Sequence, residues 1–202
     1  SELRSRICLL DYPPGTRLSE ETLAAEFGTS RTPLRRVLAR LEDEGLVQSI
    51  HGVGTIVTDV DVEEMLHVYD LRLELAQLAG NLSPIDITDK TIQAVRHFHN
   101  QAEALKRDPT ARAFAQLNMA FFHFGLTLSN NVALRDMSER LYYKTARIWL
   151  KSISKMDLTT EVDIFCREIE ETQNAIVNGD TSAAALIRRA HISMCVHRLR
   201  KS

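Results

Sequence analysis

Two arginines, Arg31 and Arg35, lie one helical turn apart just after a short turn in the N-terminal part of the chain. A guanidinium group at the start of a helix that enters the major groove of DNA can donate two parallel hydrogen bonds to guanine O6 and N7. The hydroxyl groups of Ser30 and Thr32, together with free backbone N–H groups at the helix start, can bind phosphate oxygens. These residue types and spacings predict sequence-specific DNA binding.

An apolar stripe on the same helix indicates which of its faces is buried and which is exposed. Leu34, Val37, Leu38 and Leu41 recur at the spacing of one buried face, which leaves the arginines in solvent. A run of arginines is also the usual composition of a solvated helix face, so the charge pattern alone leaves both interpretations open.

A helix, a turn and a second helix position these side chains. The first helix is predicted over residues 19–27, with Ser19 as its N-cap and Gly28 at its end. The second is predicted to start with Thr32 as N-cap and Pro33 in its first position, and to run to Glu44.

Two predicted strands follow, over residues 47–50 and 55–58, joined by a glycine-rich connection. Helix, turn, helix and hairpin together are typical of a winged helix. The tip of the hairpin carries His51 and Gly52, which can lie against a minor groove. Before this unit, Leu3 and Ile7 are already in helical phase, which predicts a helix under way at Ser1.

The remainder of the chain has successive helical patterns separated by polar breaks. Six helices are predicted, at residues 62–79, 88–106, 110–128, 133–154, 160–177 and 181–200. The predicted fold class is therefore mainly α: a winged helix-turn-helix with a small β-hairpin in residues 1–58, a linker in residues 59–61, and an all-helical bundle in residues 62–202. Bundles of this kind can hold a ligand between facing helices.

Composition narrows the functional classes. With 202 residues and a net charge of −2, any DNA binding must come from a local basic cluster. Three widely separated cysteines argue against a disulfide framework and a structural zinc site, and they predict a reducing, cytoplasmic location. Neither a signal peptide nor an apolar run of about 20 residues is visible, so no membrane association is expected. The absence of nucleophile, P-loop and zincin motifs predicts that the protein is not an enzyme.

The stretch PPGTRLSEETLAAEFGTSRTPLRRVLARLEDEGLV resembles the DNA-binding domain of the GntR family of bacterial transcription regulators. The resemblance covers residues 3–58. It implies that Arg31, Thr32, Arg35, His51 and Gly52 contact double-stranded operator DNA. It also implies that the protein is a sequence-specific transcription regulator, and we expect a repressor rather than an activator.

Residues 62–202 are similar to the FCD effector-binding domain of the FadR subfamily, most visibly in VYDLRLELAQLAG, LNMAFFHFGLTLSNN and REIEETQNAIVNGDTSAAALIRRAHI. The similarity implies a homodimer whose affinity for the operator is controlled by a small-molecule effector bound in the bundle. Many such domains hold a divalent metal through an aspartate and three histidines, and the metal binds an organic acid.

The metal-binding pattern of the family is broken in this sequence. The similarity places Asn118 at the aspartate, Phe122 and Ile169 at two of the histidines, and only His191 at a retained ligand position. An imidazole and a neutral amide cannot supply the three or four ligands of a tightly bound ion, so we predict no metal cofactor. A lone histidine on an apolar helix face is also more often a hydrogen-bonded core residue than a ligand.

Loss of these ligands makes the predicted cavity more apolar, which favours an effector that is bulkier or less acidic than a small organic acid. Arg72 and Arg147 match positions where the family often turns an arginine towards the cavity, and Tyr143 lies one turn before Arg147. The predicted effector site is therefore Arg72, Asn118, Phe122, Tyr143, Arg147, Ile169 and His191. Arg140, Lys144, Arg147 and Lys151 equally form a plain basic stripe, which would leave Arg147 in solvent.

One other functional class is compatible with a winged helix: a protein-interaction module, without an effector, whose basic helix faces another protein. Loss of a DNA band shift in Arg31→Ala and Arg35→Ala variants would decide between the two.

Overall fold

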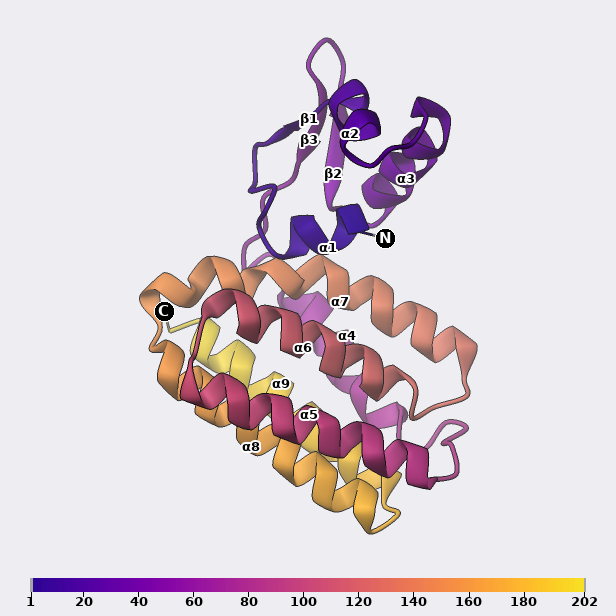
Figure 1. The fold of residues 1–202 in the computed structure, drawn as a ribbon, viewed down its shortest axis with the longest axis vertical. Coiled ribbons are helices and arrows are strands. Elements are labelled where there is room, and N and C mark those ends of the chain that lie inside the picture. Colours follow the sequence, from indigo (N-terminus) through magenta and orange to yellow (C-terminus); the bar gives the residue numbers. More distant parts are fainter. Residues whose placement is uncertain (1, 202) are drawn as a thin grey trace.

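The computed structural model describes residues 2–201, so the expectation concerning Ser1 lies outside the described residues. Figure 1 shows a small N-terminal part seated on a larger bundle of helices. The N-terminal part contains α1 (Glu2–Cys8), β1 (Arg17–Leu18), α2 (Glu20–Glu26), α3 (Arg31–Asp43), β2 (Val47–Ile50) and β3 (Gly54–Val57). The bundle contains α4 (Leu66–Leu78), α5 (Asp89–Arg107), α6 (Ala111–Leu126), α7 (Val132–Ser152), the short 3₁₀ helix η1 (Ile153–Lys155), α8 (Leu158–Val177) and α9 (Thr181–Leu199).

The N-terminal part is a winged helix, as the sequence pattern predicts. Its three strands pair in the antiparallel order β1-β3-β2, with Val47 opposite Val57. Leu34, Leu38 and Leu41 of α3 are buried, so the apolar stripe of this helix faces the core. Gly28 and Gly45 follow α2 and α3 with positive φ values of 59° and 75°, which an L side chain adopts at a cost.

Two local predictions in this part are wrong. Helix α3 begins at Arg31 with Ser30 as its N-cap, so Thr32 is already helical and does not cap it. Pro33 then lies in the third position, which is equally tolerant because the first four N–H groups of a helix lack an intrahelical acceptor. Strand β1 was not predicted: with two residues it is too short to show any alternation.

The bundle has the six α-helices that the sequence predicts, within the part of the chain that the structure describes. Most of them start at a side-chain N-cap that accepts a hydrogen bond from a backbone N–H group: Thr88, Thr110, Asn131, Asp157 and Asp180. Helix α4 starts at Leu66, four residues later than predicted, because the Asp61 carboxylate accepts from the N–H group of Glu63 and supports a turn there.

Aromatic side chains fill the centre of the bundle. The ring of Phe114 stacks on Trp149 at 3.8 Å, and Phe98 packs edge to face on Phe121 and tilted on Phe124. Burying a side chain of this size stabilises the fold by about 1.5–3 kcal/mol. None of the helices in residues 2–201 is long and apolar enough to cross a bilayer.

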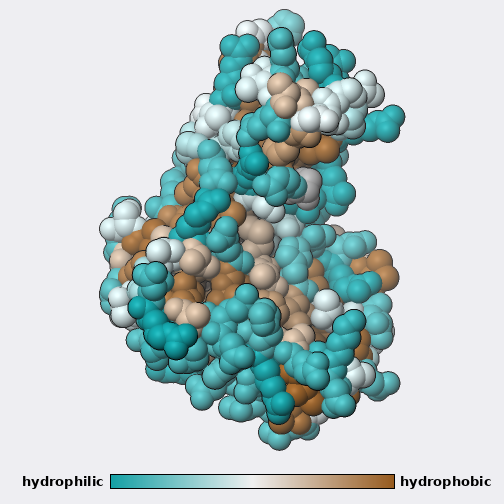
Figure 2. Space-filling view, viewed as in Figure 1, coloured by the Kyte–Doolittle hydropathy of each residue, from teal (hydrophilic) through white to brown (hydrophobic). Residues whose placement is uncertain are grey.

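The junction between the two parts is itself packed. Helix α1 lies along α7 in Figure 1, and Tyr142 and Tyr143 of α7 belong to the same buried cluster as the winged-helix core. The guanidinium of Arg4 in α1 lies 4.4 Å from the centre of the Tyr143 ring and pairs with Glu44 at 2.7 Å. Figure 2 shows a largely hydrophilic face with hydrophobic side chains gathered near this junction and at the lower edge of the bundle.

Candidate DNA interface and effector cavity

The start of α3 presents the two arginines that the sequence singles out. Both Arg31 and Arg35 are exposed, and both donate hydrogen bonds to the carboxylate of Glu20 in α2. The closest contacts are 3.3 Å from Arg31 Nη2 and 2.8 Å from Arg35 Nε. These bonds hold the pKa of Glu20 below its usual value, so its carboxylate is ionised at neutral pH. The two guanidinium groups are therefore held side by side at the tip of the helix.

The same helix tip carries the hydroxyl groups. Ser30 is the N-cap residue, but its side chain makes no capping hydrogen bond, and both Ser30 and Thr32 are exposed. The first N–H groups of α3 have no intrahelical acceptor and point out of the helix start. Hydroxyl and N–H donors thus surround the two arginines, which is the arrangement that binds a phosphate group.

The wing, which is the hairpin of β2 and β3, is hydrogen-bonded to α3, the recognition helix of the winged helix. The carboxylate of Glu42 in α3 accepts hydrogen bonds from the backbone N–H group and the hydroxyl group of Ser49 in β2, at 2.6 and 3.0 Å. His51 and Gly52 lie in the turn between β2 and β3 and are exposed, with Gly52 at a φ of 75°. The turn therefore projects from a hairpin that is hydrogen-bonded to α3.

Two cavities lie inside the bundle. The first has a volume of about 80 Å³ and a mainly apolar lining, which includes Phe121, Phe122, Phe124, Gly125 and Leu128. The second has a volume of about 90 Å³ and a more polar lining, which includes Asn118, Thr145, Glu168 and His191. Arg72, Arg188 and Ile192 line both cavities, so the two meet at these residues.

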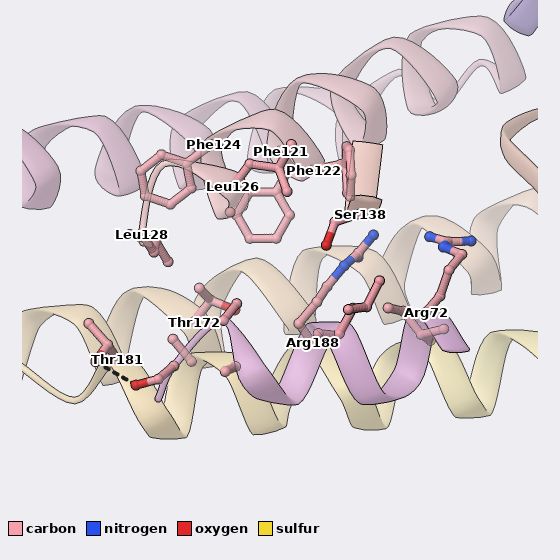
Figure 3. Close-up of a pocket in the computed structure, with 18 residues that line it drawn as sticks. Arg72, Phe121, Phe122, Phe124, Leu126, Leu128, Ser138, Thr172, Thr181 and Arg188 are labelled. Atoms are coloured by element: carbon pink, nitrogen blue, oxygen red, sulfur yellow. Dashed lines mark hydrogen bonds between the residues drawn. The ribbon is translucent and has the colours of Figure 1, made fainter. Parts of the chain in front are cut away.

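Figure 3 shows how charge is distributed in the first cavity. The guanidinium groups of Arg72 and Arg188 reach into one end, near Ser138 and Phe122, whereas Phe124 and Leu128 lie at the other end. Arg188 donates to Glu168 at 2.6 Å and so has an anionic partner. Arg72 is buried, donates to the Thr145 hydroxyl oxygen at 2.6 Å and lies against the rings of Tyr69 and Tyr142.

His191 is buried beside two carboxylates in the second cavity. Its Nε2 lies 3.1 Å from Glu171 and its Nδ1 lies 3.9 Å from Glu168. This is the hydrogen-bonded environment expected of a core histidine.

The positions that would complete a metal site in the family do not fit one here. Phe122 stacks flat on Tyr142 at 3.9 Å, and Ile169 is fully buried in the apolar core. Within residues 2–201, no group of three histidine, cysteine or carboxylate side chains is placed to hold a metal ion.

The structure brings four of the seven predicted effector residues to the cavities. Arg72, Asn118 and His191 line the second cavity, and Phe122 and Arg72 line the first. Three residues are placed elsewhere, which corrects the prediction for them. Ile169 packs in the bundle core outside both linings.

Tyr143 and Arg147 lie on the opposite side of α7 from the cavities. Tyr143 packs into the winged-helix cluster and its hydroxyl group is hydrogen-bonded to His123 at 2.8 Å. Arg147 donates to the carbonyl oxygen of Thr58, directly after the wing, at 2.5 Å. Its helix presents this face to the DNA-binding part, so neither side chain can reach a ligand in the bundle.

The basic stripe of α7 is only partly solvated, because Arg147 is buried, whereas Arg140 and Lys151 are exposed and hydrogen-bonded. Arg140 donates to the carbonyl oxygen of Asp43 at the end of α3, at 3.2 Å. Lys151 pairs with Asp59 at 2.6 Å, and Arg147 contacts Thr58. The stripe therefore binds the end of the recognition helix and the segment that follows the wing.

Sequence reasoning did not single out several cavity residues. Arg188 and Thr145 carry no local signal, because an arginine among alanines in a helix and a threonine within a basic helix have many possible environments. Gly125 shares a helical row with Asn118 and Phe122, and its position in the last turn of a helix, where glycine costs stability relative to alanine, is the signal that could have marked it as a cavity residue.

Both parts of the chain match known families. Residues 1–57 match the family described as bacterial regulatory proteins, gntR family, and residues 67–194 match the FCD domain. A helix-turn-helix regulator from an unstable DNA locus of Streptomyces ambofaciens is 29% identical over 95% of this chain and 79% of its own length. The Nta operon transcriptional regulator of Aminobacter aminovorans is 33% identical over 65% of this chain and 64% of its own length.

A shorter sequence match and two solved structures are also similar to this chain. The gluconate operon transcriptional repressor of Bacillus subtilis is 39% identical over 37% of this chain and 30% of its own length. Among solved structures, E. coli McbR/YncC superposes with a TM-score of 0.83 at 18% identity, over 99% of this chain and 94% of the other. A regulator of Rhodococcus sp. RHA1 gives a TM-score of 0.74 at 20% identity, over 100% of this chain and 95% of the other.

Proposed function

The chain belongs to the gntR family of bacterial regulatory proteins and is a DNA-binding transcriptional regulator with an FCD effector-binding domain, and we propose that Arg31 and Arg35 read its operator. The observation that supports this is the Glu20 carboxylate, which holds both guanidinium groups together at the exposed tip of α3. Ser30 and Thr32 contact phosphate in this proposal, and His51 and Gly52 of the wing lie against the adjacent minor groove.

Binding to an operator fragment and to random duplexes tests the proposal. Arg31→Ala and Arg35→Ala each weaken specific binding by about 1–3 kcal/mol and relax the preference at one base pair, because each removes a bidentate contact to guanine. Arg107→Ala, an exposed arginine at the C-terminal end of the bundle helix α5, serves as the matched control and leaves both affinities unchanged. Equal losses on operator and random DNA would show that the two arginines do not read bases.

We propose that the regulator acts as a homodimer through its helical domain. Leu71 and Leu78 lie seven residues apart, on the same face of α4, and are 46% and 38% exposed, which leaves an apolar surface on this helix. A two-fold axis through this surface would pair two recognition helices with a pseudo-palindromic operator. Sedimentation analysis of Leu71→Glu should show a monomer, whereas Val177→Glu on α8 should remain dimeric.

We propose further that the effector binds in the bundle without a metal. The support is that Phe122 and Ile169 stand where the family has metal-ligating residues: Phe122 lines the first cavity and stacks on Tyr142, and Ile169 is buried in the apolar core. Elemental analysis of the purified protein tests this, together with a thermal-shift screen with zinc, nickel and manganese. Stoichiometric metal would overturn it.

Effector and operator are coupled in this proposal through the placement of the winged helix on α7. A ligand can change the affinity for DNA only by its different affinity for two such placements. Repression is the proposed sign, since the Bacillus subtilis relative is named a repressor, and the proposed place of action is the bacterial cytoplasm. In vitro transcription from a promoter that overlaps the operator, with and without the protein, distinguishes repression from activation.

A further inference from the structure

The buried charge of Arg72 lacks an anionic partner. Within residues 2–201, no aspartate or glutamate side chain forms an ion pair with this guanidinium, whose contacts are the Thr145 hydroxyl group and two tyrosine rings. Burial lowers the pKa of Arg72, but a guanidinium group remains protonated at neutral pH. A buried, unpaired charge is costly, and an anion placed beside it would relieve that cost.

The neighbouring cation does not compete for such an anion. Arg188 is already paired with Glu168, so the junction of the two cavities carries one unbalanced positive charge. Ser138 lies at the same end of the first cavity and can donate a hydrogen bond from its hydroxyl group. One carboxylate group on a ligand therefore balances the positive charge at this end of the cavity, whereas a second carboxylate group would have no cationic partner.

The other end of the first cavity is apolar. It is lined by Phe121, Phe124, Leu126 and Leu128. Gly125 lies among them, in the last turn of α6, with a backbone that needs no glycine: a Cβ atom built there meets no other atom within 4 Å. Glycine at this position costs stability and relieves no clash within the protein, so what it provides is space in the cavity.

From these observations, and resting on the proposal that the effector binds in the bundle, we propose that the effector is a monocarboxylate with an apolar tail. Its carboxylate pairs with Arg72 at the junction of the two cavities, within reach of Ser138. Its tail extends past Gly125 between the phenylalanine rings. A tricarboxylate or a sugar phosphate does not fit, because the apolar end offers no partner for further charges.

Calorimetric titration of the full-length protein, without DNA, tests this inference. The probes are benzoate, phenylacetate, phenylpropanoate, hexanoate and octanoate, with phenylacetamide and octanamide as uncharged analogues. We expect affinity to rise with tail length and each carboxylate to bind about tenfold to a hundredfold more tightly than its amide, the range of a hydrogen bond to a charged group.

Three variants assign the two ends of the site. Arg72→Gln should abolish the preference for the carboxylate, whereas Arg72→Lys should keep part of it, which separates loss of charge from loss of fold. Gly125→Leu should weaken octanoate and phenylpropanoate binding while leaving benzoate binding intact. Arg96→Gln, an exposed arginine on α5, is the control and should change none of these affinities.

Equal binding of carboxylate and amide, no binding of any probe, or an unchanged tail-length profile in Gly125→Leu would each overturn the inference. Operator affinity measured on the same preparations is independent of these results. A protein that binds its operator but none of the probes would refute the monocarboxylate and leave the DNA-reading proposal standing.

Discussion

Arg147 of α7 donates two hydrogen bonds to Thr58: Nη1 reaches the carbonyl oxygen at 2.5 Å and Nη2 reaches the hydroxyl oxygen at 3.1 Å. The Thr58 hydroxyl group in turn donates to the carbonyl oxygen of Gly45, directly after the recognition helix, at 2.7 Å. Two residues before Arg147, Thr145 accepts from Arg72 on the cavity side of α7. Helix α7 therefore contacts the effector cavity with one face and the DNA-binding part with the other.

Replacing Arg147 with methionine should destabilise the protein and weaken this connection. Arg147 is 1% exposed, and its removal leaves the partly buried carbonyl oxygen of Thr58 without this donor, at a cost of about 1–3 kcal/mol. Urea denaturation measures the loss. Arg140→Met is the matched control, since Arg140 is exposed and its contact to Asp43 is longer, so its loss should be smaller. Equal losses of unfolding free energy in the two variants would show that the bonds to Thr58 stabilise the protein no more than the contact of Arg140.

Replacing Glu20 with glutamine should make DNA binding stronger and less selective. The carboxylate neutralises the two arginines of α3, and its hydrogen bond with Arg35 keeps its pKa low, so it repels phosphate at neutral pH. The variant should bind random duplexes more tightly, with a salt dependence steeper by about one unit of slope. Glu21→Gln is the control, because Glu21 is the next residue and is exposed. An unchanged ratio of operator to random affinity would refute this role of Glu20.

Two glycine-to-alanine changes should have opposite effects on stability. Gly125→Ala should raise the free energy of unfolding by about 0.5–1 kcal/mol, because alanine is the better helix former and its methyl group enters open space. Gly80→Ala should lower it by about 1–3 kcal/mol, because a Cβ atom there would lie 2.7 Å from the Thr181 carbonyl oxygen and 2.8 Å from Ala185 Cβ. Thermal unfolding with the same probe for both variants checks the sign, and a destabilised Gly125→Ala variant would mean that this space is not open.

Acidification should destabilise the junction through His123. Burial lowers the pKa of this imidazole below 6.5, with an opposing contribution from Glu139 and a supporting one from Arg4. The unfolded chain then binds a proton more readily than the folded one, so the stability that neutral His123 contributes is full above pH 6.5 and is lost as the pH falls through the lower folded value.

Melting temperatures measured from neutral pH down to about pH 5 test this expectation. His123→Asn should flatten the dependence in that window, whereas His67→Asn, at a fully exposed position, should leave it unchanged. If the melting temperature depends on pH equally in wild type and His123→Asn, the loss of stability on acidification comes from other groups.

The residues alone determined the order and type of nearly all elements. The stripe of Leu34, Leu38 and Leu41 and the glycines after α2 and α3 define a winged helix, because periodicity and helix stops are local properties of the chain. The spacing of Arg31 and Arg35 also predicted two arginines exposed at the start of a helix, which is where the structure has them. Strand β1 and the starts of α3 and α4 could not be located, since single turns and two-residue strands leave little pattern.

Only the tertiary structure decided which partners these side chains meet. Periodicity indicated that α7 has a basic stripe, but not that the stripe faces another domain: Arg147 lies 89 positions from Thr58 along the chain. In the same way Glu20 meets Arg35, and Arg72 meets Thr145, across folded helices rather than along one. Burial repeats along each helix and can be read from one sequence, whereas the partner of a buried or paired group depends on how distant helices pack.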